Sequence, residues 1–285
     1  MISEVYGYIE QSKDAIMKKT RENEEIIRNV KEQWIKHQPT DLRKDLAGID
    51  GSWNSTRHHG YFFYIIDAVS VDASGNYVVS PLYTADIGTP TTVEDSVIAY
   101  NTQRYLESMG SDFEYRLATE SLKKGYIVLI DNSALAMVYD RVHKKETTFI
   151  EHAKELINSR NVIFVAKTSE SRSCLNGDVG DLYYFNKYTT TAGISKPRYD
   201  HLGVTVFYAR LADWTPLIKV EVPGGMNEAE ALRVVDLLHT NSLNGYPYPL
   251  LLAHQTCKIS TSEVNIAETL LGLDVEAGAR EVVGE

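Results

Sequence analysis

The chain has 285 residues, of which 43% are hydrophobic and 24% charged, and its formal net charge at pH 7 is −10. This is the composition of a globular protein that can fill a sizeable core, in one large domain or two small ones. The longest apolar runs, such as residues 126–130, are far too short to cross a bilayer, and the acidic balance argues weakly against a nucleic-acid binder, which usually shows a basic footprint.

Cysteine usage and the N-terminal residues indicate a cytoplasmic protein. Cys174 and Cys257 are far apart, and neither belongs to a CxxC pair. This pattern argues against a disulfide framework or a thiolate zinc site and suits a reducing cytosol. The N-terminal residues include Glu4 and Glu10 and no long apolar run, so we expect no signal peptide and no attachment to a membrane.

Residues 3–38 are predicted to form one long helix. Apolar residues recur there at helical spacing, and acids and bases are spread along the span. Pro39 ends the pattern, because a proline disfavours helical geometry at the residue before it. The helix either packs on the domain or projects as an arm that binds a second copy or a partner. We expect a helical arm at residues 1–40, a main domain at 41–272 and an acidic tail at 273–285.

The next elements are predicted to form the centre of a sheet. The segment LAGIDGS (46–52) has an apolar lead-in directly before Asp50, which predicts a strand that ends at this acid. Residues 59–83 are aromatic and β-branched around a DASGN turn, which predicts an antiparallel hairpin. Residues 92–124 show a helical apolar stripe. Residues 125–133 include a continuous apolar run that ends in Asp131, typical of a strand buried on both faces.

The second half of the chain is predicted to alternate between helices and strands. We expect a helix at 146–158, a buried strand at 161–169, strands at 204–211 and 217–223, and helices at 226–240 and 248–271. This order predicts an α/β fold in which helices cover a mixed sheet. In such sheets, ligands bind beyond the carboxyl ends of the parallel strands, where Asp50, Asp131 and Lys167 are expected.

A third acid is predicted to reach the same edge of the sheet. Gly110, Glu114 and Ala118 are spaced by four, so they share one helix face, and the small neighbours of Glu114 would allow close approach to the sheet. Each acid has an ordinary alternative: Asp50 as a turn residue, Glu114 as a solvated helix charge and Asp131 as a helix cap. That all three alternatives hold together is harder to reconcile with this order of elements.

Three close carboxylates predict a metal centre, because they repel one another unless a cation neutralises them. Hard oxygen ligands favour Mn²⁺ or Mg²⁺, and two such ions can activate a water and stabilise the leaving oxygen of a phosphodiester. Gly51 fits this interpretation, since a side chain there would crowd an approaching substrate. An acidic cluster on a first strand followed by a hairpin is typical of RNase H-like nucleases, so we expect an RNase H-like mixed sheet.

Six segments in order resemble the motifs of the NurA nucleases, over about residues 46–260: AGIDGS, FEYRLATESL, VLIDNSAL, VAKTSESR, YARL with IKVEVP, and GYPYPLLLAH. That family consists of archaeal and some bacterial enzymes of DNA end resection that work with the hexameric ATPase HerA. The resemblance implies a Mn²⁺-dependent 5′–3′ exonuclease for double-strand break repair, with single-strand endonuclease activity as an open addition. Asn132 replaces a glycine that is commoner in the family, and asparagine tolerates unusual turn conformations.

The resemblance also implies roles for individual residues. It places the metal-binding acids on Asp50, Glu114 and Asp131, and a catalytic tyrosine and histidine on Tyr246 and His254. From its neighbours alone, His254 would be a core histidine, whereas the resemblance makes it a metal ligand or a contact to the scissile phosphate. Tyr246 is otherwise a packed loop aromatic, and Tyr248 competes with it for the functional role.

Lys167 and Arg172 are candidate DNA-binding residues. Cations on a polar loop suit contact with phosphates, although both could equally be surface charges.

Two other functions stay open from the sequence. One is a non-catalytic RNase H-like scaffold of an ATPase complex, which would not need three mutually repelling acids. The other is a phosphatase that uses the same metals. The chain has no GxxxxGK[ST] loop, so it is not itself a P-loop motor. We therefore expect a homodimer that acts on single-stranded DNA and duplex ends and docks on a HerA-like hexameric ATPase.

Overall fold

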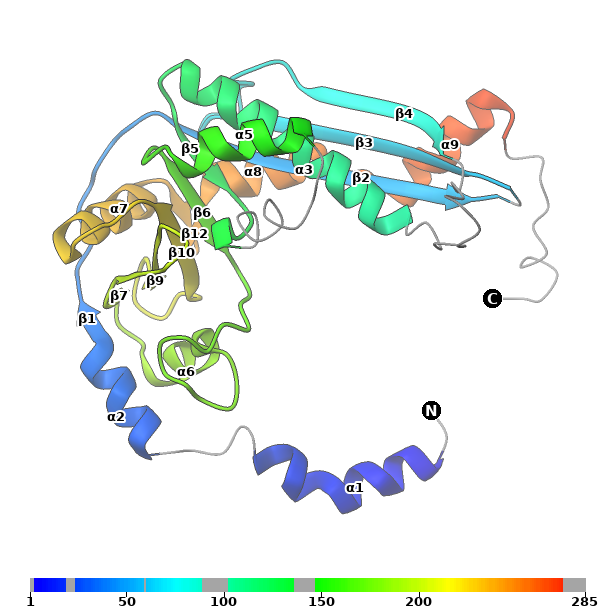
Figure 1. Ribbon diagram of the computed structural model, residues 1–285. Helices are drawn as coiled ribbons and strands as arrows, with labels where there is room; N and C mark the ends of the chain where they lie inside the picture. Colours follow the sequence, from blue (N-terminus) through cyan, green and yellow to red (C-terminus); the bar gives the residue numbers. More distant parts are fainter. Residues whose placement is uncertain (1–2, 19–23, 59, 89–101, 136–146, 274–285) are drawn as a thin grey trace. The chain divides into compact units, whose positions relative to one another are not determined.

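A computed structural model of the protein describes residues 3–18, 24–58, 60–88, 102–135 and 147–273 (Figure 1). The chain divides into two compact units, residues 44–164 with 247–285 (the acidic-site unit) and residues 1–43 with 165–246 (the second unit). The predicted acidic tail lies outside the described residues apart from Leu273. Among the helices described, none is long and apolar enough to cross a membrane.

The acidic-site unit is built on a mixed sheet with the strand order β4-β3-β2-β5-β6. Strands β2 (Leu46–Arg57), β3 (Phe62–Val71) and β4 (Leu82–Gly88) form an antiparallel meander. Strands β5 (Ile127–Ile130) and β6 (Val162–Ala166) follow in parallel with β2. Helices α3 (Thr102–Lys123) and α5 (Thr147–Ile157) lie between these strands in the sequence. This is the predicted mixed sheet flanked by helices.

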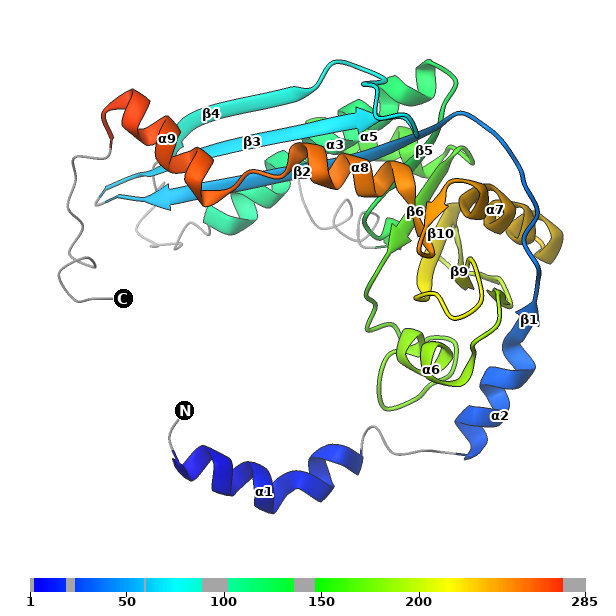
Figure 2. The same cartoon turned by 180° about the vertical axis from the view of Figure 1, so that it is seen from behind.

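Helices cover both faces of this sheet. Figure 1 shows α3 and α5 on the near face, and Figure 2, seen from behind, shows α8 (Tyr248–Cys257) and α9 (Thr261–Leu271) on the other. Strands β5 and β6 can be apolar throughout because both faces are covered there. The buried core side chains include Phe63, Ile66, Leu129 and Phe164. Helix α9 is joined to the end of β2, where His58 Nε2 lies 2.9 Å from Glu268 Oε1.

The predicted hairpin is antiparallel as expected, but its second strand begins later in the chain. The predicted 59–83 hairpin is β3 with β4, but the turn near residues 72–76 is followed by irregular chain before β4 begins at Leu82. Strand β2 also does not end at Asp50, since it continues to Arg57. The reason is its second partner: β3 supplies antiparallel hydrogen bonds from Gly48 to Arg57, whereas the parallel ladder with β5 stops at Ile49.

The second unit carries an antiparallel sheet with the strand order β1-β7-β9-β10. Its strands are β1 (Trp34–Lys36), β7 (Gly193–Ser195), β8 (Arg198–Tyr199, paired with β9), β9 (Val204–Arg210) and β10 (Ile218–Pro223). Its helices are α1 (Ser3–Lys18), α2 (Glu24–Gln33), α6 (Asp181–Tyr188) and α7 (Glu228–Thr240). A short hairpin, β11 (Ser242–Leu243) with β12 (Tyr246–Pro247), leads from α7 into α8. Ile26, Val30, Tyr184, Phe185 and Tyr208 belong to a common buried cluster.

The prediction of one helix over residues 3–38 was wrong at its C-terminal end. Helix α2 ends at Gln33, and Trp34, Ile35 and Lys36 form strand β1, whose partners are Ser195, Ile194 and Gly193. Trp34 also packs against Phe185, with ring centroids 5.9 Å apart. The hydrogen bonds and packing offered by the sheet override the helical periodicity that these residues share with α2.

The predicted helix over residues 248–271 is two helices. Helix α8 ends at Cys257, and Ser260 begins α9 with a capping box, in which the Ser260 hydroxyl and the Glu263 carboxylate each accept from the other's backbone N–H. The intervening Ile259 N–H donates to Ser52 Oγ over 3.1 Å. The break therefore fixes the chain to β2 and lets α9 take its own direction.

Candidate active site

Asp50 and Asp131 lie side by side where the parallel pairing of β2 and β5 ends. The register pairs Ile49 with Ile130, and each aspartate is the next residue along its strand. Beyond this pair, β2 continues with β3 only, so the sheet opens between the two acids. The predicted meeting of Asp50 and Asp131 thus follows from register, although Asp50 is inside a strand.

Glu114 reaches the same opening from α3. A Cβ atom built on Gly51 would lie 3.0 Å from Glu114 Oε1 and 3.2 Å from its Cγ. The Glu114 side chain therefore occupies the space that a side chain at position 51 would need. This contact explains the glycine more directly than access for a substrate does. Because successive residues of a strand point to opposite faces, Glu114 approaches from the α3 face and the Asp50 side chain points to the α8 face.

Burial and neighbouring charge perturb the carboxyl groups of Glu114 and Asp50. Burial raises the pKa of Glu114 to about 8, and the charges of Asp50 and Asp131 add to this, while a hydrogen bond from the Gly51 backbone opposes it. Burial also raises the pKa of Asp50, and the charge of Asp131 acts in the same direction. The three acids therefore affect one another electrostatically, which is the situation that a bound cation relieves.

His254 is held against Asp50 by the packing of α8. Its Nδ1 lies 2.8 Å from Asp50 Oδ2, and its side chain is 57% exposed. The core-histidine interpretation is thus wrong, while Leu250 and Cys257 on the same helix are buried as expected. Helix α8 approaches β2 at Gly48, where a Cβ atom would lie 2.3 Å from the Pro249 backbone. Glycine at 48 is what permits this approach.

Asp67 is a fourth acid near the site that the sequence did not single out. It pairs with Ser52 in the register of β3 and β2, which places it on the same sheet face as Asp50. The pKa of Asp67 is raised to about 7, mainly by burial, and the negative charges of Glu263 and Asp50 raise it further. The sequence signal was a lone acid inside the apolar strand FFYIIDAVSV, but its neighbours depend on the strand register.

The donor chemistry of the site fits a hard divalent cation. Asp50, Glu114 and Asp131 offer carboxylate oxygens, which suit Mg²⁺ and Mn²⁺, and a cation would favour the ionised form of Glu114. Within the described part of the chain, no three His, Cys, Asp or Glu side chains already form a complete set of ligands. Binding a metal would therefore draw the carboxylates closer together than they lie here.

Three other predicted residues belong to the second unit. Lys167 directly follows β6, as expected, and its Nζ lies 4.5 Å from the centroid of the Tyr246 ring, a cation–π contact. Arg172 is exposed on the following loop. Tyr248, the alternative to Tyr246, is the first residue of α8 in the acidic-site unit.

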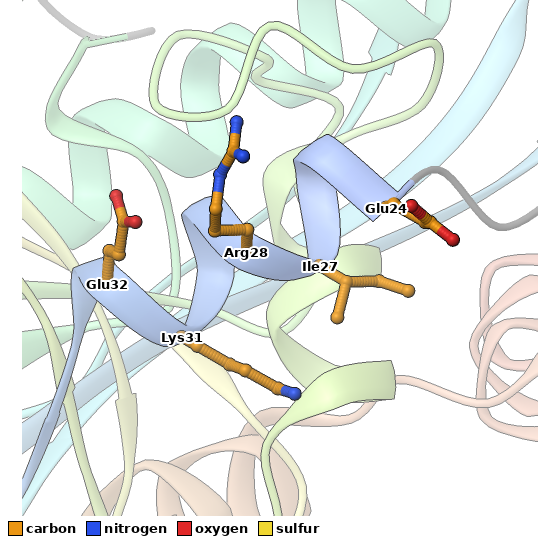
Figure 3. A pocket seen from close by; sticks show the side chains of 5 residues that line it. All are labelled: Glu24, Ile27, Arg28, Lys31 and Glu32. Atoms are coloured by element: carbon orange, nitrogen blue, oxygen red, sulfur yellow. The ribbon is translucent and has the colours of Figure 1, made fainter.

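A hollow of about 390 Å³ lies beside α2 in the second unit and contains none of the predicted residues. All of its lining residues come from this one helix: Glu24, Ile27, Arg28, Lys31 and Glu32. Figure 3 shows their side chains spreading away from α2 in different directions. They do not converge on a shared point, so this hollow lacks the arrangement of a catalytic site.

Comparisons with known proteins agree with this fold. A family model described as the NurA domain matches residues 44–259. A relative from Methanocaldococcus jannaschii, named "Probable DNA double-strand break repair nuclease NurA", is 23% identical over 359 residues, covering 98% of this chain and 91% of the relative.

Solved structures show the same fold. The crystal structure of the NurA nuclease from Sulfolobus solfataricus superposes with a TM-score of 0.73 at 21% identity, covering 98% of this chain and 100% of that one. A crystal structure of NurA bound to dAMP and manganese gives a TM-score of 0.65 at 10% identity, with coverage of 99% and 98%.

Proposed function

The chain belongs to the NurA family, since the family model spans most of its length, and we propose that it is a metal-dependent DNA nuclease of double-strand break repair. The observation that carries the proposal is the group of three acids at the end of the β2–β5 ladder. A scaffold protein gains nothing from Glu114, a carboxyl group whose ionisation is opposed by both burial and neighbouring charge.

Asp50, Glu114 and Asp131 would hold two metal ions. We propose that these ions are Mn²⁺, with Mg²⁺ as the alternative. A solved NurA structure with manganese supports this choice. Two such ions supply activation of the attacking water and stabilisation of the leaving oxygen of the phosphodiester. The protein's own part is to keep the three carboxylates beside one another where the sheet opens.

His254 orients Asp50 and offers a second nitrogen atom to the reaction. With the Nδ1 proton donated to Asp50 Oδ2, Nε2 keeps its lone pair. Because the side chain is largely exposed, Nε2 can accept a proton or contact the scissile phosphate. In this arrangement His254 assists the metal ligands, and we propose direct metal ligation only as the alternative.

Lys167, Tyr246 and Arg172 are proposed to hold the DNA rather than the metal. The Tyr246 ring supports the Lys167 ammonium group, which would contact a backbone phosphate. Arg172 would add a second phosphate contact on the same loop. We propose 5′–3′ exonuclease activity, with cleavage of single strands as an additional activity.

We further propose a homodimer that receives DNA from a HerA-like hexameric ATPase. The net charge of −10 provides little non-specific attraction to DNA, because such attraction comes from cations that release counterions. The sequence contains no P-loop to power movement along a duplex. A two-fold dimer is the simplest closed assembly, and α1, with no buried side chain, is a candidate contact.

The direct experiment incubates end-labelled single- and double-stranded DNA with the protein and Mn²⁺, Mg²⁺ or EDTA. We expect cleavage with Mn²⁺, weaker cleavage with Mg²⁺ and none with EDTA, since the carboxylates need a cation. Long duplex ends should be resected only when the ATPase and ATP are added. DNA binding without cleavage under every metal condition would instead establish the scaffold function.

Replacing His254 with alanine is expected to lower the cleavage rate about 100-fold or more, as for loss of a general acid or base. The melting temperature should stay close to that of the wild type, because the side chain is mostly exposed. Rates and thermal unfolding curves measure the two effects. Gln255→Ala, an exposed neighbour on α8, is the matched control. A normal rate combined with a lowered melting temperature would show that His254 has only a structural role.

A further inference from the structure

A cleft in the second unit has a lining unlike that of the acidic site. Its volume is about 410 Å³, within the range of about 300–1,000 Å³ that is usual for small-molecule sites. All of its lining residues belong to the second unit, so the cleft exists independently of the acids. They are Lys167, Thr168, Ser169, Glu170, Gly180, Leu182, Tyr183, Asn186, Pro216 and Leu217.

The lining combines polar and apolar residues. The loop after β6 contributes Lys167 and the hydroxyl groups of Thr168 and Ser169, whereas Leu182, Pro216 and Leu217 are apolar. Tyr183 of α6, with 39% of its surface exposed, adds an aromatic ring. A ligand with both an anionic group and an aromatic ring would match this lining. Cations and hydroxyl groups bind phosphate, and a tyrosine ring stacks with a nucleobase.

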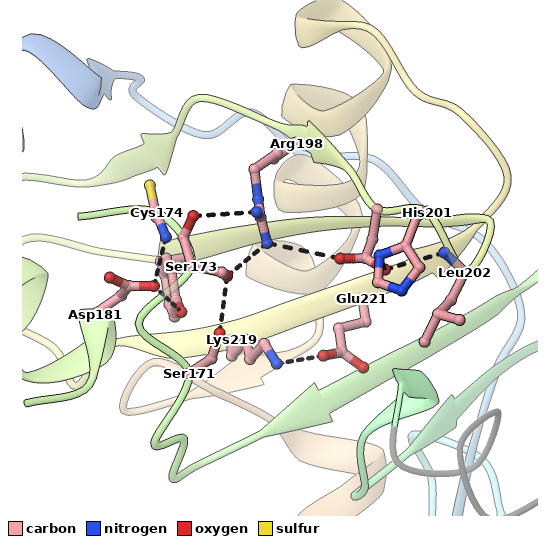
Figure 4. Close-up of polar contacts among 11 residues, drawn as sticks. Ser171, Ser173, Cys174, Asp181, Arg198, His201, Leu202, Lys219 and Glu221 are labelled. Carbon is pink, nitrogen blue, oxygen red and sulfur yellow. Dashed lines mark hydrogen bonds and ion pairs between the residues drawn. The ribbon is translucent and has the colours of Figure 1, made fainter. Parts of the chain in front are cut away.

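The loop and α6 are fixed to each other. Asp181, fully buried at the start of α6, accepts hydrogen bonds of 2.9 Å from the backbone N–H groups of Cys174 and Leu175 (Figure 4). The Asp181 N–H donates to Ser171 O over 2.7 Å. Arg198 adds a bond from Nη1 to Ser173 O over 3.1 Å. The loop therefore does not have to be ordered by a ligand, which lowers the cost of binding.

Polar groups around Tyr183 are also held in place. Lys187 Nζ lies 5.7 Å from the centroid of the Tyr183 ring, so a second cation accompanies the aromatic face. Asn186 Oδ1 accepts from Arg210 Nη2 over 3.1 Å, which leaves the Asn186 amide NH₂ group to donate to a ligand. In the lining, the one acid, Glu170, is balanced by Lys167, and Lys187, which lies outside the lining, adds the second cation.

We propose that this cleft is a subsite for one nucleotide of a DNA single strand, with the base stacked on Tyr183 and the phosphate at Lys167. The subsite rests on the proposed nuclease function and extends it, because it holds the strand at a place that is separate from the metal-binding acids. A free nucleotide shares this chemistry, so a test must compare a strand with a mononucleotide.

The test measures binding of a fluorescein-labelled single-stranded oligonucleotide of about 12 nucleotides by anisotropy in EDTA, where no cleavage occurs. Tyr183→Ala is expected to weaken binding about 10-fold, in keeping with the loss of one base-stacking contact. Tyr183→Phe, which keeps the ring, should bind like the wild type, and Tyr183→Leu, which fills similar space without a ring, should bind like the alanine variant. Tyr199→Ala removes an exposed tyrosine of β8 outside the cleft and is the matched control.

The outcomes separate the subsite from the nuclease proposal. Hydrolysis of a small chromogenic phosphodiester with Mn²⁺ reports the acidic site alone and should be equal in all four variants. If that activity is present but Tyr183→Ala and Tyr183→Leu bind the strand as tightly as Tyr199→Ala does, the subsite proposal is overturned while the nuclease function stands. If dAMP displaces the oligonucleotide as well as an unlabelled strand does, the cleft is a mononucleotide site and the strand assignment is overturned.

Discussion

Asp50→Ala is expected to reduce Mn²⁺-dependent DNA cleavage at least about 1,000-fold, because loss of an outer partner of a metal ligand alone typically costs 10–100-fold. Asp50 has a central place in the site. It adjoins Asp131 across the sheet opening, and its carboxylate is hydrogen-bonded to His254. The fold should survive, because β2 keeps its backbone hydrogen bonds to β3. Asp131→Ala should give a comparable loss.

Cleavage of labelled DNA under single-turnover conditions and a thermal unfolding curve measure these two expectations. Asp86→Ala is the matched control, since Asp86 is an exposed aspartate on β4 of the same sheet. Full activity of the Asp50→Ala protein would exclude the assignment of the metal site. An inactive protein that is also unfolded would require the milder Asp50→Asn change before the role of the carboxylate is judged.

Glu114→Gln is expected to stabilise the metal-free protein at pH 8 by about 4 kcal/mol while it abolishes cleavage. The folded protein holds the Glu114 proton up to a pKa of about 8, whereas an ordinary glutamate loses it near 4.5. Folding is therefore linked to proton binding between these values, and stability falls as the pH rises through this window. Glutamine carries no charge, so the variant escapes this loss, and its advantage should be absent near pH 4.5 and complete above pH 8.

Urea unfolding in EDTA at pH 5 and pH 8 measures this difference. Asp50 and Asp67 also have raised pKa values, so part of the wild-type decline with pH should remain in the variant. Glu120→Gln, at an exposed position on the same helix, is the control and should gain nothing. A Glu114→Gln protein with the same stability as the wild type at pH 8 would mean that the Glu114 carboxyl group is better solvated than its position over Gly51 indicates.

Local patterns were enough to place Glu114 and Asp131. The apolar run before Asp131 ends where β5 ends, and the small residues around Glu114 lie where α3 approaches the sheet, with Ala118 fully buried and Gly110 beside Trp53. These features depend on neighbours within one element, which the sequence displays directly. The order of the elements from β2 to β6 was readable for the same reason.

Features that depend on partners distant in the sequence were harder to predict. Strand β1 owes its conformation to β7, and the environment of Asp67 depends on the register of β3 with β2. The exposure of His254 depends on how α8 is placed over β2, which its helical periodicity does not specify. The break before α9 was missed, although Ser260 and Glu263 have the spacing of a capping box and could have revealed it.

Because α8 must pack against Gly48 to bring His254 to Asp50, the site can form only at a late point in the synthesis of the sheet and its helices. Asp50 and His254 are 204 positions apart, and α8, which brings them together, is synthesised after all the strands of the acidic-site unit. A nascent chain that has already folded its sheet thus still lacks the histidine. Contacts of such large sequence separation also form late in folding, because the loop-closure entropy must be overcome first. The proposed site therefore stays incomplete in the growing polypeptide until α8 has left the ribosome and packed on β2.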